Sequence, residues 1–233
     1  MAQKFSQFFI IFLIGLLAAV FNEVIFSPLF VKKNFFFKQD QPLRIIERKE
    51  TIIQEKPDLK EAVKKVQKTV IAINTNLGGN TFSGSGLILT ADGLVITLAD
   101  LVPKSGNFSF SADSKILKAE ILKRDLKENL ALAKIEGNNF LVPNFLDQKI
   151  SLGEKIFVLS SFFEDNKNNL EVQEGIISKI KEDSFETNLL VEKKLAGSPV
   201  FDFNGKVVGL AKITKNGKLE IMPLQKIKNF AGF

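Results

Sequence analysis

From Thr69 to Leu224 the sequence is a succession of short apolar runs separated by turn residues, and this pattern limits the fold most strongly. Three turn dipeptides stand between such runs: Asp92-Gly93, Asn204-Gly205 and Asn216-Gly217. They tolerate the positive φ angles that tight hairpins require. Many short strands joined in this way predict an all-β barrel or sandwich. The runs span residues 69–75, 85–90, 93–99, 107–112, 115–124, 130–136, 155–161, 171–180, 187–192, 198–203, 206–213 and 218–224.

Helical patterns occur at the two ends of this region. Apolar residues recur at helical spacing in Asp58–Lys68, with Asp58 placed to cap the first turn and Glu61 inside it. The segment Pro223–Phe233 predicts a second, closing helix. The sequence therefore predicts an all-β domain with short terminal helices.

The N-terminal stretch Phe8–Phe21 carries no charge and predicts a membrane segment. A helix needs about 20 apolar residues to cross a bilayer, so we expect this one to extend toward Val31. Residues 1–31 are assigned to a single-pass transmembrane anchor, and 32–57 to a stalk or linker with an initial strand. A cleaved signal peptide is the alternative, but no convincing cleavage site of small residues occurs before Val20 and Phe21.

The charges around this segment argue against an outward-facing domain. Lys4 precedes it, whereas four basic residues follow it, and basic residues favour the cytoplasmic side. A hydrophobic segment at the extreme N-terminus nevertheless usually acts as an export signal, and a family resemblance described below points the same way. We expect an extracytoplasmic folded domain tethered to the cell membrane. The four basic residues are Lys32, Lys33, Lys38 and Arg44.

Composition excludes several classes of chemistry. The 233 residues include neither Cys nor His, which removes thiol nucleophiles, disulfides, thiolate metal sites and imidazole proton transfer. The net charge is +6, but the basic residues are interspersed with acidic residues along the chain. Phe is the only aromatic residue type, so nucleic-acid binding is not expected. No acidic run has the spacing of a calcium loop. We predict no metal and no cofactor.

Three segments follow one another in a recognisable order. They read GSGLILTADGLVITLADLV in Gly84–Val102, ENLALAKI in Glu128–Ile135 and KLAGSPVFDFNGKVVGLA in Lys194–Ala211. They resemble the catalytic neighbourhoods of trypsin-like serine peptidases of the HtrA (Deg) type. EGIISKI in Glu174–Ile180 and MPLQKIKNF in Met222–Phe230 resemble a later strand and the closing segment of that family. The resemblance covers about Val70 to Phe230 and implies a trypsin-like double β-barrel.

The resemblance also locates three catalytic positions, and none holds the family residue. Asp100 stands where the family has its catalytic His, Asn129 where it has the Asp that orients the imidazole, and Ala196 where it has the nucleophilic Ser. Acyl transfer on this scaffold needs a hydroxyl nucleophile, an imidazole and an orienting carboxylate. Ala196 has no nucleophilic atom, and a carboxylate at position 100 cannot cycle protons like imidazole near neutral pH.

The oxyanion region is expected to be altered as well. It comprises Lys194, Leu195, Gly197 and Ser198, and Lys194 replaces a Gly that lets a backbone N–H point inward in the family. Ser198 activated by Lys194 or Lys193 would be an unconventional nucleophile, but Ser is common in turns.

The remaining polar residues near these motifs have simpler interpretations. Asp100 is interpreted as a solvated loop carboxylate, against pairing with a partner cation or Lys104, and Asn129 as a residue that begins a strand. Ser83 and Ser85 are interpreted as part of a loop before a strand, and not as a phosphate cradle.

These observations predict that residues 58–233 form a non-catalytic, trypsin-like pseudoprotease domain that binds extended peptide or protein segments. Because the chain ends at Phe233, the PDZ domain that often follows in HtrA-type proteins is not expected. An envelope scaffold subunit and a serine endopeptidase with an unconventional active site are the alternatives. The sequence leaves the oligomeric state and the identity of the partner open.

Overall fold

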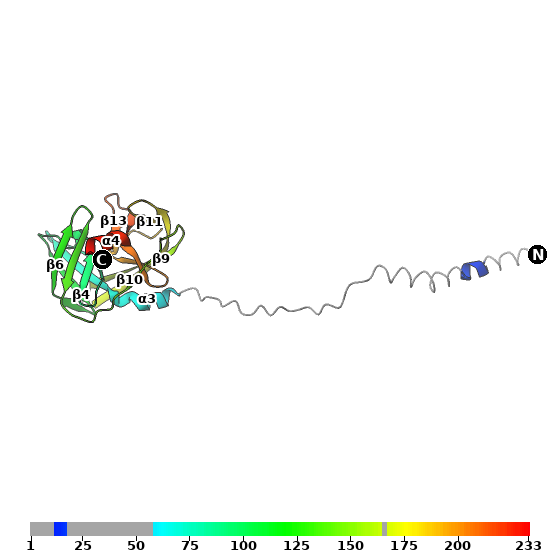
Figure 1. The fold of residues 1–233 in the computed structure, drawn as a ribbon, viewed down its shortest axis with the longest axis horizontal. Helices are drawn as coiled ribbons and strands as arrows, with labels where there is room; N and C mark the ends of the chain where they lie inside the picture. The colour runs from blue at the N-terminus through cyan, green and yellow to red at the C-terminus, as the bar shows by residue number, and fades with distance from the viewer. Residues whose placement is uncertain (1–11, 18–57, 165–166) are drawn as a thin grey trace, which may run out of the picture. The chain divides into compact units, whose positions relative to one another are not determined.

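The computed structural model describes residues 12–17, 58–164 and 167–233 (Figure 1). The chain divides into two compact units, residues 1–54 and 55–233. In the first unit residues 12–17 are helical, and the rest of the predicted anchor and of the stalk with its initial strand lies outside the described residues. Among the residues described, no helix combines the length and apolar character needed to cross a membrane.

Seven strands of the second unit form the first sheet, in the order β5-β4-β1-β2-β3-β7-β6. The two edge strands, β5 and β6, are separated in the chain by Lys118 alone, so one bent segment pairs with β4 at its start and with β7 at its end. This segment closes the sheet into a barrel, and the single strand predicted for 115–124 is in fact two. The strands are β1 (Val70–Leu77), β2 (Asn80–Ile88), β3 (Leu94–Thr97), β4 (Asn107–Ala112), β5 (Lys115–Leu117), β6 (Ala119–Asp125) and β7 (Leu130–Ile135).

The second sheet has the order β12-β9-β10-β11-β14-β13-β8, and a further pairing of β12 with β13 closes it. The short strand β8 lies parallel to β13 outside this ring and was not predicted. The all-β, double-barrel architecture predicted from the sequence is thus confirmed. The strands are β8 (Asn144–Phe145), β9 (Lys155–Glu164), β10 (Lys167–Ile180), β11 (Phe185–Thr187), β12 (Pro199–Asp202), β13 (Lys206–Ile213) and β14 (Leu219–Pro223).

The hairpin dipeptides were predicted correctly, but one strand was not. Gly93, Gly205 and Gly217 have φ values of +91°, +80° and +71°, as the turn chemistry requires. The predicted strand at 187–192 is wrong, because β11 ends at Thr187 and the residues after it form a loop. Leu190 in this loop is 73% exposed, so its apolar character does not reflect a place in the core.

Both terminal helices are present. Helix α3 (Leu59–Val66) begins at Asp58, whose carboxylate accepts a hydrogen bond from the Lys60 amide at 3.3 Å. Helix α4 (Leu224–Ala231) ends at Gly232, whose φ of +87° allows the left-handed cap. The second unit also contains the short 3₁₀ helices η2 (Gln67–Thr69), η3 (Ala99–Leu101) and η4 (Lys193–Leu195).

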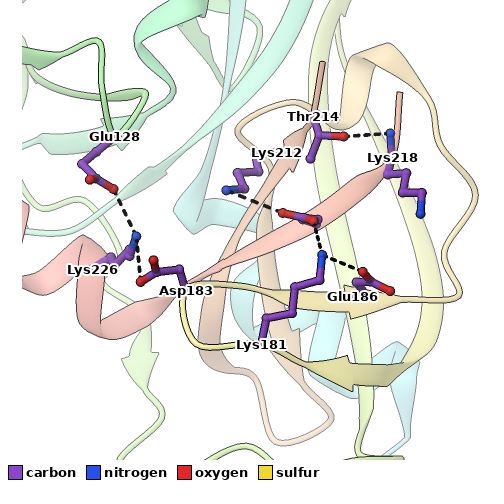
Figure 2. Close-up of polar contacts among 9 residues, drawn as sticks. Glu128, Lys181, Asp183, Glu186, Lys212, Thr214, Lys218 and Lys226 are labelled. Atoms are coloured by element: carbon purple, nitrogen blue, oxygen red, sulfur yellow. Dashed lines mark hydrogen bonds and ion pairs between the residues drawn. The ribbon is translucent and has the colours of Figure 1, made fainter. Parts of the chain in front are cut away.

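Helix α4 joins the two barrels through its polar side chains (Figure 2). Lys226 pairs with Glu128, before β7 of the first barrel, at 3.1 Å and with Asp183, between β10 and β11 of the second, at 3.2 Å. Both carboxylates raise the pKa of Lys226, with Glu128 making the larger contribution. Lys123 of β6 donates to the Phe230 carbonyl at 3.0 Å. The C-terminal helix therefore contacts both barrels, between which the candidate site lies.

Candidate functional site

Asp100 and Asn129 lie together at the surface of the first barrel. The Asn129 side-chain amide donates to Asp100 Oδ2 at 2.8 Å, and the Asp100 backbone N–H donates to Asn129 Oδ1 at 3.0 Å. Asn129 directly precedes β7 with a φ of +56°, a left-handed conformation that Asn tolerates. Asn129 therefore begins a strand as predicted, and it is also the hydrogen-bonding partner of Asp100, which the sequence did not indicate.

Two side chains of the first barrel donate hydrogen bonds to backbone carbonyls of the 3₁₀ turn that carries Asp100. Thr75 of β1 donates its hydroxyl to the Leu101 carbonyl at 2.5 Å, and Arg124 of β6 donates to the Val102 carbonyl at 2.6 Å. The Leu101 side chain is buried and lies against Gly84, where an added Cβ would come within 2.5 Å of it. Asp100 itself remains exposed. The turn is thus rigidly supported and presents one carboxylate to solvent.

The segment with Ala196 forms a tight turn between η4 and β12. The backbone N–H of Ala196 donates to the Lys193 carbonyl at 3.2 Å, and that of Ser198 to the Leu195 carbonyl at 3.1 Å. Gly197 has a φ of +74°, and a Cβ there would lie 2.3 Å from the Ser85 carbonyl oxygen. Only glycine fits this position, because both the backbone conformation and the available space exclude a side chain.

Ser85 and Ser198 belong to a buried hydroxyl cluster between the two barrels. Ser198 Oγ lies 3.1 Å from Ser85 Oγ, which donates to the Ser161 carbonyl at 3.1 Å and accepts from the Ser161 amide at 2.9 Å. Ser198 is fully buried, whereas Lys193 is exposed. The structure therefore does not bring Ser198 together with a lysine base, as an unconventional dyad would need.

The interpretation of Ser83 and Ser85 as loop residues was wrong. Both lie inside β2, where they pair with Asn74 and Ala72 of β1. The neighbouring glycine, Gly84, is required for close packing and not for a turn, since a Cβ there would also lie 2.6 Å from the Ala196 carbonyl. Gly-Ser-Gly patterns are typical of loops, but here the segment pairs with β1 along its whole length and its glycine packs against the Ala196 turn.

Lys194 extends from the turn toward β10. Its ammonium pairs with Glu171 of β10 and, at 3.1 Å, with Glu192, and it lies 5.3 Å from the centre of the Phe162 ring. Hydrogen bonds from the ammonium to Glu171 and then Glu192 raise the pKa of Lys194. Glu192 also accepts from the Gln173 side chain at 2.6 Å. Lys194 is therefore fixed by a network of charges instead of projecting freely into the site.

A cavity of 480 Å³ opens beside Lys194, between β1 and β2 of the first barrel and β9 of the second. Asn74 spans the two barrels there by donating to the Phe163 carbonyl at 2.9 Å. A larger cavity of 580 Å³ lies around Leu146, Phe185 and Leu224, and none of the candidate site residues lines it. We take the smaller cavity as the candidate binding site because it adjoins the turn. Its lining residues are Asn74, Thr81, Ser83, Phe162, Phe163, Glu164 and Lys194.

The described part of the chain contains no cluster of three or more acidic side chains that could hold a metal ion. Three carboxylates around the site have other partners: Asp100 is bonded to Asn129, and Glu171 and Glu192 share Lys194. The prediction that no metal or cofactor is used stays a prediction.

Residues 84–210, more than half of the chain, match the family described as "Trypsin-like peptidase domain". The match includes Asp100, Asn129 and the whole turn around Ala196. Among solved structures, the serine endoprotease from Yersinia pestis superposes with a TM-score of 0.67 at 17% identity, covering 75% of this chain and 65% of that one. At this identity the superposition supports the fold alone.

Curated relatives carry names of the same type. "Probable periplasmic serine endoprotease DegP-like" of Pseudomonas putida is 28% identical over 137 residues, which are 54% of this chain and 28% of that protein. "Serine protease HTRA1" of Xenopus laevis is 28% identical over 165 residues, which are 64% of this chain and 35% of that protein. The matched region thus spans about a third of the length of these relatives.

Proposed function

The chain belongs to the trypsin-like peptidase domain family and is of the HtrA or DegP type, and from this premise we propose its function. We propose that it is a non-catalytic member that binds extended peptide or protein segments between its two barrels. The observation that carries this proposal is the presence of Ala196 at the position of the family's nucleophilic Ser. Ala196 lies in a turn whose supporting contacts, from Gly84, Ser85 and Gly197, are intact. Its methyl group offers no atom that can attack a carbonyl carbon.

The Asp100–Asn129 pair supports the same conclusion. In the family, the residue that corresponds to position 129 is a carboxylate, and it accepts a hydrogen bond from the imidazole that corresponds to position 100. Here the direction is reversed, because Asn129 donates and the Asp100 carboxylate accepts. The pair keeps the two segments together but holds no group that removes a proton from a nucleophile and returns it to a leaving amine. The chain contains no His that could replace it.

The proposed binding mode follows from the cavity beside Lys194. Its walls are strands from both barrels, and they present two apolar rings, one side-chain amide, two hydroxyls, the Glu164 carboxylate and the Lys194 ammonium. An extended segment can add to a strand edge through its backbone and place alternate side chains in adjoining pockets. Apolar and amide-bearing peptide side chains match the Phe162, Phe163 and Asn74 side chains of this wall.

Hydrogen exchange tests this binding mode. The full-length chain is incubated with and without extended apolar peptides, and single-amide exchange rates are compared. We expect slower exchange in the segments at 81–83 and 162–164 and in the turn 194–200, with unchanged rates around the distant cavity at Leu146. Uniform protection, or no protection at saturating peptide, would exclude the cleft and leave the envelope scaffold alternative.

A serine endopeptidase with an unconventional active site is the second candidate, because the relatives are named as a serine endoprotease and a serine protease. Ser198 is the hydroxyl nearest to the turn, and it is fully buried and bonded to Ser85. Peptidase activity through Ser198 would require this cluster to open. The cleavage assay at the end of the Discussion separates the two candidates.

We also place the folded domain outside the cytoplasm, since the bacterial relatives are named periplasmic. The uncharged stretch Phe8–Phe21 is proposed as its membrane tether. Cell fractionation tests this: the full-length protein should sediment with membranes and keep its N-terminal residues. A mature protein that starts between Val20 and Phe30 would rule out the tether.

A further inference from the structure

The loop that leads into the Ala196 turn is attached along β10 by side chains of both segments. At its start, Asn188 Oδ1 accepts from the Ile176 amide at 2.8 Å. Gly175 allows this approach, since a Cβ there would lie 2.5 Å from the same oxygen atom. Farther along, Gln173 Nε2 donates to Glu192 Oε1 at 2.6 Å. The loop therefore has a defined position relative to β10 before it reaches the turn.

At the end of the loop, one cation is shared by two carboxylates. Lys194 pairs with Glu171, whose backbone belongs to β10, and with Glu192, which precedes η4. About a third of each of these side chains is exposed, with fractions of 33% for Lys194 and 29% for Glu171. The pairs are thus partly shielded from solvent, so they are screened less than pairs on an open surface.

These contacts hold the turn in a conformation with no free amide at Ala196. The Leu195, Ala196 and Ser198 N–H groups donate to the carbonyls of Glu192, Lys193 and Leu195, respectively. Stabilising an oxyanion requires N–H groups that point toward it instead. Freeing the Ala196 N–H requires the backbone around Lys193 and Lys194 to rotate, and the anchored Lys194 side chain resists that rotation.

We propose that Glu171, Glu192 and Lys194 form an ionic lock that keeps the 193–196 turn closed, with the Ala196 amide bonded to the Lys193 carbonyl. This proposal rests on the proposed function in one respect, because it assigns Ala196 to the position of the family's nucleophile. The site is thereby closed to oxyanions by its conformation, in addition to lacking a nucleophile. All three residues are positioning residues, since they act through the turn and not on a ligand.

The test is the exchange rate of the Ala196 amide in the full-length protein, measured by hydrogen exchange resolved to single amides. Lys194→Met keeps the length of the side chain and removes its charge. We expect exchange at Ala196 to accelerate about tenfold in this variant. The Ile135 amide, which donates to the Gly93 carbonyl at 2.9 Å and has no contact with the turn, reports on the stability of the surrounding fold and should keep its rate.

Lys193→Met is the matched control, because Lys193 is adjacent, exposed and has no ion pair in the described part of the chain. It should leave the Ala196 rate unchanged. Glu171→Gln should reproduce the effect of Lys194→Met and serves as the second variant if that protein does not fold. An Ala196 rate equal to wild type in both Lys194→Met and Glu171→Gln would overturn the lock. Amide exchange does not depend on catalysis. The result of this test is therefore independent of whether the wild type cleaves peptides.

Discussion

At the scale of single residues, our proposal is that the site keeps the backbone geometry of its family while its side chains differ. Asn and Asp both tolerate the left-handed conformation, so an amide in place of a carboxylate at position 129 leaves the start of β7 undisturbed. Under the same proposal, Ala196 lacks a nucleophilic atom, while its turn is held by contacts with Gly84, Ser85 and Gly197. Gly197 differs from both, because its backbone conformation and its surroundings admit no other residue.

Gly197→Ala should therefore cost about 2–4 kcal/mol of unfolding free energy, since it combines left-handed strain with a clash against Ser85. Gly217→Ala is the matched control: its φ of +71° is similar, but nothing lies within 4 Å of an added Cβ. That variant should cost about 1 kcal/mol. Urea titration of both variants measures the difference, and equal losses would show that the close approach at Gly197 is unimportant.

At the scale of elements, Ser85 connects β2 of the first barrel to β9 and to the turn before β12. Its hydroxyl forms hydrogen bonds with the Ser161 amide, the Ser161 carbonyl and the Ser198 hydroxyl. Buried polar groups that lose their partners are costly, so this one side chain couples three elements.

We expect Ser85→Ala to destabilise the protein by about 2–4 kcal/mol, because it leaves a buried amide, carbonyl and hydroxyl without this partner. Ser83→Ala removes one half-buried hydrogen bond, to Asn74 at 2.6 Å, and should cost about 1 kcal/mol. Thermal or urea unfolding of the two variants compares these losses. A Ser85→Ala protein as stable as Ser83→Ala would mean that the hydroxyl cluster does not couple the barrels.

The elements also show which features the sequence could predict. Ten or more strands, the hairpin dipeptides and both helices follow from local patterns, and the structure contains them. The loop at 188–192 has the apolar composition of a strand, but the Asn188 side chain bonds the Ile176 amide and strand pairing ends at Thr187. Strand β8 has only two residues, too few for any periodicity.

The sequence assigned three positions to the candidate site, but it did not indicate their contacts or the residues that line the cavity. Asp100, Asn129 and Ala196 follow from motif order. The pairing of Asp100 with Asn129 and of Lys194 with Glu171 depends on chain segments far apart in sequence, so neither pair could be identified from spacing. The buried state of Ser198 depends in the same way on β2.

At the scale of the whole molecule, ion pairs connect the last strands and the closing helix to both barrels. Glu220 of β14 is the most buried member, with a side chain 12% exposed. It accepts a hydrogen bond from Lys181 at 2.7 Å and lies 3.7 Å from Lys212. Lys181 and Lys212 are labelled in Figure 2. The hydrogen bond from Lys181 lowers the pKa of Glu220 below its ordinary value of 4.5. The same lysine lowers the pKa of Glu186.

A carboxylate whose pKa is lower in the folded state stabilises the protein fully above its unfolded pKa. That contribution is lost as the pH falls from 4.5 through the folded value. Glu220→Gln should therefore cost about 1 kcal/mol at neutral pH and reduce the loss of stability on acidification. Urea midpoints between neutral pH and pH 3 measure this, with the exposed Glu174→Gln as control. Parallel pH profiles for wild type and Glu220→Gln would contradict the assignment.

The central claim is that this trypsin-like domain does not cleave peptide bonds, and cleavage itself is the most direct measurement. Full-length wild type and Ser198→Ala are incubated with fluorogenic peptides and unfolded proteins, and new peptide termini are counted by mass spectrometry. We expect neither protein to generate termini above a buffer control. Cleavage by the wild type that disappears in Ser198→Ala would contradict the claim and establish Ser198 as a nucleophile.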